Sequence, residues 1–359
     1  MSWLSYMKLN RSRAWKLAVG AIVLCAFSLL LFGGSLANND RDDDRGELFW
    51  PKPPDRARIK YLESISSPKD LKLKQSSLFK RIVKKIVGIS DADTTMVFPY
   101  GVTTDSQNHI IVVDSRSRLI HVFDERGKKY FSIKQPKGEM FVSPIGVAVD
   151  AADNIYVSDS YTGKILVFDK SGKFVKRLGP DEGQFDRPTG IAIDKTRGHL
   201  YVVETRKGEV DVLNLNGAEL FKFGKRGVGK GDFNRPTQIC IRDARVYVTD
   251  TLNARIQILD LDGTYISSIG HLGDAIGDLD KPKGVAVDSE QHIYVVGGLH
   301  DVVTIFDQQG NFLLSFGGTG SHRGEFYLPT AIHIDGDDNI YVSDTYNRRV
   351  QVFKYLKAG

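Results

Sequence analysis

A unit of 44 to 48 residues repeats six times along this chain, and this repeat limits the possible folds more than any other feature. Each unit opens on a proline, and the six are Pro99, Pro144, Pro188, Pro236, Pro282 and Pro329. Up to four short apolar runs follow each proline, the first two of the kind seen at residues 190–194 and 155–159. Periods of this size with four strand-length runs are typical of β-propeller blades. Because one blade cannot bury both faces of its sheet alone, we expect an all-β fold with six blades stacked around an axis.

Charge is distributed unevenly between the N-terminal segment and the repeats. Residues 1–90 carry 17 Lys and Arg against 8 Asp and Glu, whereas residues 91–359 carry 32 against 36. A nucleic-acid-binding domain would normally show a basic surface, so this mildly acidic repeat region argues against nucleic acid as a partner. Of the two cysteines, Cys25 lies in an N-terminal apolar run and Cys240 in a predicted strand, so we expect no disulfide between them. We interpret Cys240 as a small buried hydrophobic residue.

The first 36 residues have the pattern of a membrane anchor. A basic segment, residues 1–16, precedes an uncharged apolar stretch at residues 17–36, which as a helix would span about 30 Å. The acidic residues that follow predict, by the positive-inside rule, a cytoplasmic N-terminus and extracytoplasmic (periplasmic) repeats. We expect a retained single-pass signal-anchor. The alternatives are a signal peptide cleaved after residue 37, which would make the protein secreted, and lipid attachment at Cys25. Residues 37–56, charged and rich in proline, then form a linker.

The sixth repeat ends before its fourth strand, which leaves the ring open unless another segment completes it. Residues 57–64 alternate polar and apolar side chains at the period of a strand, so we expect this segment to close the last blade. The propeller domain then covers residues 57–359, with the repeats at 96–359. Residues 77–89 form an amphipathic helix with a basic face, which either lies on a membrane surface or packs its apolar face on the propeller.

The repeat resembles the NHL repeat, most plainly at residues 250–258 and 344–352, which share an Asp, an Asn, an Arg and a Gln at fixed spacing. The resemblance extends over all six units and implies a six-bladed propeller. An anchored extracytoplasmic propeller of this type is similar to bacterial sensor or scaffold proteins, in which the ring is a binding platform. The resemblance also implies that two sets of loops surround the same mouth of the channel: those between strands two and three, and those between consecutive blades.

Features shared by most repeats are interpreted as structural, and function is expected where repeats differ. The shared features are bulky residues three positions before each proline (Met96, Phe141, Phe185, Phe233, Leu279 and Phe326) and the acids Asp114, Asp159, Asp250 and Asp344, expected to accept hydrogen bonds from turn backbone. The candidate binding residues at the expected mouth are Tyr100, Arg116, Tyr161, Thr189, Glu204, Arg206, Thr237, Lys283, His300, Asp301 and Tyr346. Their hydroxyl, aromatic and cationic groups suit a peptide segment or a glycan, for example on an envelope protein.

Two enzyme classes share the implied fold and provide an alternative hypothesis, a lyase or lactone hydrolase with a metal in the channel. The lyases imply three histidine ligands for zinc, and the lactonases a set of oxygen ligands for calcium. Of the eight histidines only His333, in the innermost strand of repeat 6, is placed to reach the channel. The sequence therefore predicts a binding protein without cofactor, metal or catalytic residues.

Overall fold

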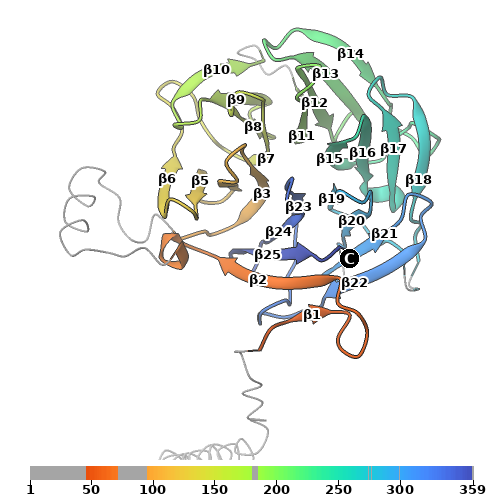
Figure 1. Ribbon diagram of the computed structural model, residues 1–359. Coiled ribbons are helices and arrows are strands. Elements are labelled where there is room, and N and C mark those ends of the chain that lie inside the picture. The colour runs from red at the N-terminus through yellow and green to blue at the C-terminus, as the bar shows by residue number, and fades with distance from the viewer. Residues whose placement is uncertain are drawn as a thin grey trace, which may run out of the picture. The chain divides into compact units, whose positions relative to one another are not determined.

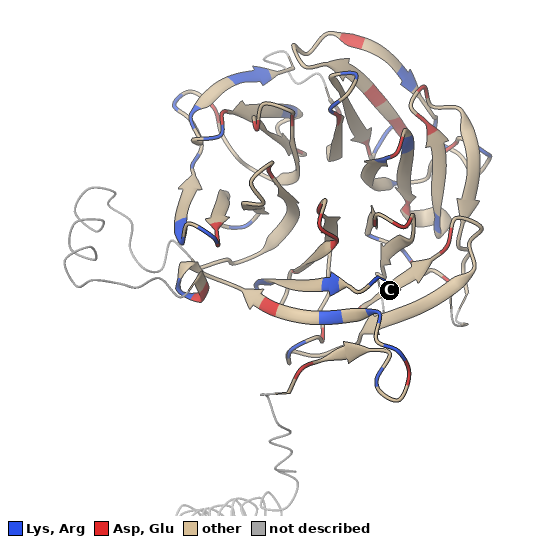
Figure 2. Ribbon diagram, in the orientation of Figure 1, with Lys and Arg blue, Asp and Glu red and all other residues tan. Residues whose placement is uncertain are grey.

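The structure is a computed structural model that describes residues 46–71, 95–179, 185–273, 275, 277–298 and 300–357. Six antiparallel sheets are arranged as the blades of a ring around a central channel (Figure 1), which confirms the predicted six-bladed propeller. Charged side chains lie mostly in turns and outer strands, and the strands that border the channel are largely uncharged (Figure 2).

Within the described residues, the first five blades are four-stranded sheets in which consecutive strands pair. Their strands, from the channel outward, are β3 (Pro99–Thr104), β4 (Ile110–Asp114), β5 (Leu119–Asp124) and β6 (Lys129–Ile133); β7 (Pro144–Val149), β8 (Ile155–Asp159), β9 (Lys164–Phe168) and β10 (Phe174–Leu178); β11 (Pro188–Asp194), β12 (His199–Glu204), β13 (Glu209–Asn214) and β14 (Glu219–Phe223); β15 (Pro236–Arg242), β16 (Arg245–Asp250), β17 (Arg255–Asp260) and β18 (Tyr265–Ile269); and β19 (Gly284–Val287), β20 (Ile293–Val296), β21 (Val302–Phe306) and β22 (Phe312–Gly317). A 3-10 turn, η3 (Thr251–Asn253), joins β16 to β17.

The second and third strands of each blade are apolar on both faces because both faces pack against neighbouring blades. All five residues of β4 are buried, for example, and so are all five of β8. The bulky residues before the prolines fill the spaces between blades, with exposed fractions of 0% for Phe233 and 4% for Phe185. The predicted packing role of these residues is therefore confirmed.

The repeated acids bind turn backbone as predicted. Asp159 accepts hydrogen bonds from the backbone N–H groups of Val142 and Ser143 at 2.7 and 3.0 Å. It also accepts from Tyr161 and Thr162, in the turn between the second and third strands, at 3.1 and 3.0 Å. One buried carboxylate thus ties the loop that enters a blade to a turn inside it, which explains why the acid recurs.

The N-terminal part of the propeller completes the sixth blade. This blade has the strand order β1 (Phe49–Trp50), β2 (Ile59–Ile65), β25 (Arg349–Tyr355), β24 (Asn339–Asp344) and β23 (Ala331–Ile334). β2 pairs antiparallel with β25 from Ile59 opposite Tyr355 to Ile65 opposite Val350. The short helix η1 (Pro68–Leu71) follows β2. The segment expected to close the ring therefore does so, shifted by one or two residues at its ends.

The expected linker, residues 37–56, overlaps the propeller, so its predicted boundary needs correction. Phe49 and Trp50 pair with Lys60 and Ile59 of β2. The Trp50 ring lies 5.9 Å from Phe316 and 5.8 Å from Phe353, against the core of the last two blades. The partly buried indole anchors this end of the chain by packing its apolar surface against these rings. The prolines beside Trp50 led to the prediction of a linker here.

Two predicted N-terminal features, the anchor at residues 17–36 and the amphipathic helix at residues 77–89, lie outside the described residues. Within the residues that are described, no helix is both long enough and apolar enough to cross a bilayer.

Candidate functional site

The channel is bordered by the first strand of each blade, β3, β7, β11, β15, β19 and β23, and it differs at its two ends. At the end where these strands begin, which we call the narrow end, the cavity has a volume of about 20 Å³. At the end where they finish, the wide end, it has a volume of about 560 Å³. Val102, Val147, Ile191 and Gln238 line both cavities and therefore mark the constriction between them.

The predicted binding residues that follow the blade prolines lie at the narrow end. Tyr100, Thr237 and Lys283 line its small cavity, whereas Thr189 does not. Burial raises the pKa of the Tyr100 phenol. A cavity of this volume has room for about one water molecule, so the narrow end cannot enclose a substrate.

The threonines near the narrow end hold neighbouring blades together. Thr189 and Thr205 share a hydrogen bond of 2.7 Å, and the Thr205 hydroxyl donates to the Pro236 carbonyl of the next blade at 2.7 Å. Thr237 and Thr251 repeat this arrangement, with an Oγ1–Oγ1 distance of 2.8 Å. The hydroxyls of Thr189 and Thr237 are thus hydrogen-bonded within the fold, and the ligand-binding role expected for them stays a prediction.

Two acids in the candidate set are buried in structural positions. Glu204 is fully buried and accepts hydrogen bonds from the N–H groups of Asp186 and Arg187 at 3.1 and 3.0 Å, as the aspartates of other blades do. Asp301, 3% exposed, accepts from the N–H of Leu328 at 2.8 Å. Neither side chain can reach a partner on the surface.

The remaining candidates are exposed around the narrow end and are not gathered at one point. Tyr161 is 78% exposed, and His300 is also exposed. The guanidinium of Arg206 forms an ion pair of 3.0 Å with Asp186, on a different blade from Arg116 and Tyr346. The predicted mouth is therefore a broad rim of separate side chains.

Three aromatic rings form a cluster where the sixth and first blades meet at the narrow end, and we call Phe98, Tyr327 and Tyr346 the aromatic cluster. Tyr346 lies 5.4 Å from Phe98 and 5.4 Å from Tyr327, in both cases edge to face. The Arg116 guanidinium lies 5.9 Å from the centre of the Phe98 ring. Tyr327 and Tyr346 are 46% and 51% exposed. The sequence analysis included Arg116 and Tyr346 but missed Phe98 and Tyr327. These two residues lie one and two positions before a blade proline, where most of the other repeats have polar residues.

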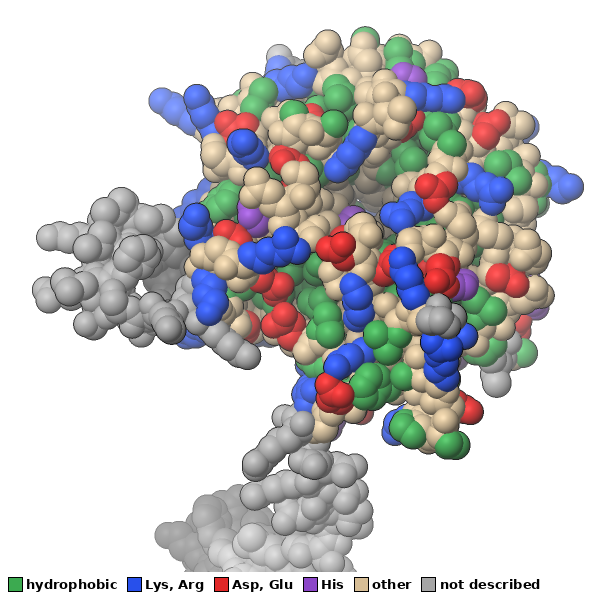
Figure 3. Space-filling view, in the orientation of Figure 1, with side chains coloured by type: hydrophobic (Ala, Val, Ile, Leu, Met, Phe, Trp, Pro, Cys, Tyr) green, Lys and Arg blue, Asp and Glu red, His purple; other side chains and the backbone are tan. Residues whose placement is uncertain are grey.

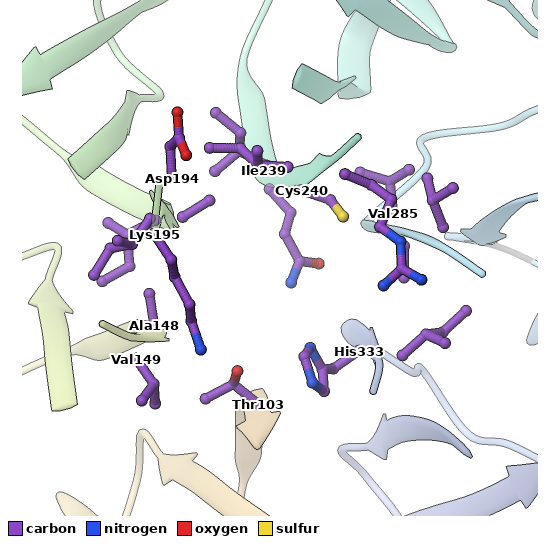
Figure 4. A pocket seen from close by; sticks show the side chains of 18 of the residues that line it. Thr103, Ala148, Val149, Asp194, Lys195, Ile239, Cys240, Val285 and His333 are labelled. Atoms are coloured by element: carbon purple, nitrogen blue, oxygen red, sulfur yellow. The ribbon is translucent and has the colours of Figure 1, made fainter. Parts of the chain in front are cut away.

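The wide-end cavity was not predicted as a site. Figure 4 shows Lys195, Thr103 and His333 pointing toward the middle of this cavity from three sides. His333 Nε2 lies 2.9 Å from the Thr104 hydroxyl. Burial lowers the pKa of His333 to about 4, and the positive charges of Lys195 and Arg242 act in the same direction. The imidazole is therefore neutral at physiological pH, and His333 reaches the channel as expected.

A signal for this cavity was present in the repeats. The fourth residue after each blade proline lines the channel and is alanine in three repeats, but Thr103, Cys240 and His333 in the others. Arg242 likewise replaces an aspartate that the other five repeats share, and Gln238 replaces a glycine that four of the other repeats share. Comparing these positions, in addition to the one after the proline, would have located the polar part of the channel.

The wide-end cavity does not suit the metals that the enzyme hypothesis requires. Its lining combines one imidazole, one thiol, cationic side chains and the carboxylates of Asp194 and Asp243, each of which lies within 4 Å of an arginine. Zinc and calcium need several histidines or carboxylates in one place. Burial also raises the pKa of the Cys240 thiol to about 11, which keeps it protonated. Within the described part of the chain, no three His, Cys, Asp or Glu side chains are grouped to hold a metal ion.

Comparisons with known proteins agree with this architecture. A family model described as a 6-bladed beta-propeller matches residues 137–223, and the model of the NHL repeat matches residues 326–353. A search of curated proteins found no match.

Three solved structures illustrate the similarity in fold. A streptogramin B lyase has 13% identity and a TM-score of 0.55, over 73% of this chain and 94% of that one. An auxiliary nutrient binding protein from Bacteroides thetaiotaomicron has 14% identity and a TM-score of 0.57, over 73% and 70%. A gluconolactonase from Xanthomonas campestris has 16% identity and a TM-score of 0.54, over 73% and 87%. Identities this low establish a shared fold and no shared activity. The repeats, the six sheets and the two family models together identify the chain as a six-bladed β-propeller with NHL repeats.

Proposed function

We propose that this protein is a non-enzymatic binding propeller that recognises an extended peptide segment of an envelope protein through the narrow end of the ring. The observation that carries the proposal is the exposed aromatic cluster with Arg116 beside it. Extended peptides commonly dock on aromatic-lined surfaces, and Tyr and Arg are enriched among the residues that dominate binding energy. The edge-to-face rings present separate notches for side chains, which favours a peptide over the flat face of a sugar.

The closed narrow end supports binding over catalysis. Its cavity of about 20 Å³ leaves no enclosed space where a substrate could be desolvated and reacted. A partner must therefore be held on the outer surface. The similarity in fold to both a lyase and a nutrient binding protein is compatible with either class, so the choice depends on the side chains of this chain.

We further propose that residues 17–36 tether the ring to a membrane, with the propeller on the extracytoplasmic side. The proposal rests on the length of the uncharged stretch and on the basic residues before it. Adding a reporter that is active only outside the cytoplasm to the C-terminus tests it. Reporter activity in the membrane fraction is expected, and activity confined to the cytoplasm would contradict the topology.

Photo-crosslinking in intact cells tests the binding proposal. A crosslinking amino acid at position 346 is expected to capture one defined envelope protein, whereas the same group at position 170, in a turn outside the narrow end, is not. Peptides that tile the captured protein should then bind the purified chain, and Tyr327→Ser with Tyr346→Ser should abolish this binding. Tyr161→Ser is the matched control, because Tyr161 is more exposed but lies outside the cluster. Equal losses in the two variants, or capture of a glycan only, would contradict the proposal.

The enzyme hypothesis is tested by a metal assay on the purified chain. Stoichiometric zinc or calcium would revive a lyase or lactone hydrolase with a metal in the channel.

A further inference from the structure

The wide-end cavity has the size and the composition of a small-molecule site. Its volume of about 560 Å³ falls in the range of about 300–1,000 Å³ that is usual for ligand pockets. Apolar side chains from different blades, such as Val147, Ile239 and Val285, form its walls. Figure 3 shows one face of the ring with a hollow near its centre and Lys and Arg side chains beside it. Such a cavity can bury the apolar part of a small ligand, while a polar group of the ligand needs a hydrogen bond or an ion pair with the protein.

The charges at the wide end leave one cation without a partner. Arg197 donates to Asp262 at 2.7 Å and lies 3.9 Å from Asp194, whose carboxylate points away from the middle of the cavity (Figure 4). Arg242 lies 3.8 Å from Asp243. Lys195, by contrast, has no hydrogen bond or ion pair with any other described residue, although its ammonium points toward the middle of the cavity (Figure 4). One unpaired positive charge above an apolar cavity favours a ligand with a single negative charge.

Neutral polar groups lie deeper in the same cavity. The Gln238 side chain makes no hydrogen bond to the described part of the protein, and its Oε1 is buried without a partner. Thr103 faces the cavity, and His333 is tied through Nε2 to Thr104. Buried polar groups are normally hydrogen-bonded, so an unpaired amide in a cavity of this size indicates that another molecule completes it.

We propose that the wide-end cavity binds a small organic carboxylate with an apolar body, with Lys195 at its carboxylate and His333 and Gln238 as further polar contacts. A phosphate dianion fits less well, since Arg197 and Arg242 are each engaged with a carboxylate of the protein. The site is at the opposite end of the channel from the peptide surface of the proposed function and does not depend on it. The two ends can therefore be tested separately.

Calorimetric titration of the full chain, kept in a mild non-ionic detergent, tests the proposal with benzoate, benzyl alcohol and inorganic phosphate as probes. Benzoate and benzyl alcohol have nearly the same apolar body and differ in charge. A charge-assisted hydrogen bond is worth enough that benzoate should bind at least about tenfold more tightly than benzyl alcohol. Inorganic phosphate, which lacks the apolar body, should not compete with benzoate.

Substitution of the cation locates the site. Lys195→Met should lower benzoate affinity about tenfold and leave benzyl alcohol binding unchanged. Lys170→Met is the matched control, because Lys170, like Lys195, acts electrostatically on Asp153 but does not line the cavity. Lys195 is exposed and makes no hydrogen bond or ion pair with another described residue, so its loss should not unfold the protein.

The NMR signals of the His333 ring provide a readout of position. They should shift on addition of benzoate. Absence of benzoate binding, equal binding of benzoate and benzyl alcohol, equal losses in the two lysine variants, or unshifted His333 signals would each overturn the proposal.

Discussion

The third blade contains a buried pair of acids that should make the stability of the whole ring depend on pH. In the fourth and sixth blades a glutamine seven residues after the aspartate donates to it, with Gln257 to Asp250 at 3.3 Å and Gln351 to Asp344 at 3.0 Å. The third blade has Glu204 and Asp211 at these two positions, fully buried and 4% exposed. Two acids cannot make the bond that an acid and an amide make unless one of them holds a proton.

The cost of this pair can be worked out from its pKa values. Burial raises the pKa of Glu204 from 4.5 to about 7 and that of Asp211 from 3.8 to about 6, and the repulsion of Asp211 contributes to the rise at Glu204. A rise of this size at one carboxyl corresponds to about 3 kcal/mol. Because the folded state holds the proton more tightly, stability is complete below about pH 4 and is lost as the pH rises to about 7.

Asp211→Gln restores the pairing of the other blades and should therefore stabilise the protein. The expected gain is about 2–3 kcal/mol at pH 8 and falls to within about 1 kcal/mol of zero at pH 4, where both acids are protonated in the folded state and about half protonated when unfolded. Urea unfolding of the full chain at the two pH values measures it. Gln257→Glu, the reverse change in the fourth blade, should cost a similar amount at the higher pH. A gain of equal size at both pH values, or none at the higher one, would refute the argument.

Three further predictions concern ring closure, inter-blade packing and the wide-end cavity. Tyr61→Ala should lower the free energy of unfolding by about 3–4 kcal/mol, because this buried ring packs edge to face against Phe353 at 5.5 Å. Leu62→Ala, on the exposed face of β2, is the control and should lower it by less than about 1 kcal/mol. Phe326→Ala should cost about 3–5 kcal/mol in the same urea assay, because Phe326 is fully buried between the fifth and sixth blades. Benzoate should bind more tightly as the pH falls from about 7 to about 5, a range in which its own carboxylate stays ionised, because a bound anion favours the imidazolium of His333. His333→Asn should remove this dependence in calorimetric titrations.

Several charged groups near His333 influence its pKa and therefore the expected pH dependence of benzoate affinity. Asp335 raises the pKa of His333, and Lys195 and Arg242 lower it, while the ring of Tyr341 lies 6.1 Å away. Benzyl alcohol is the control, because a neutral ligand leaves this balance unchanged. If its affinity varied with pH as that of benzoate does, the dependence would come from the protein surroundings instead of from an anion beside the imidazole.

The blades could be predicted because each of their features recurs in most or all of the six repeats. A buried strand needs an apolar run, a turn needs its acid, and a space between blades needs a bulky side chain, so each physical requirement leaves a repeated mark such as Phe233 or Asp159. β1 leaves no such mark. It is only two residues long and lies beside prolines, and the packing of Trp50 depends on Phe316 and Phe353, more than 260 residues away in the sequence.

The candidate sites could not be found by examining one repeat at a time, because their side chains come from different repeats and meet only in the folded ring. Tyr346 and Phe98 are neighbours only because the ring closes, and no spacing within one repeat brings them together. The channel is simpler, since one position of the repeat supplies a single side chain per blade to the same ring of the cavity. Three of the six repeats have alanine at this position, and Thr103 and His333 make the lining of the cavity polar at two of the others. A buried polar group in an apolar channel costs free energy unless it is hydrogen-bonded. The positions where polar side chains replace the repeated apolar ones are therefore the positions where a bound ligand would gain the most from hydrogen bonds.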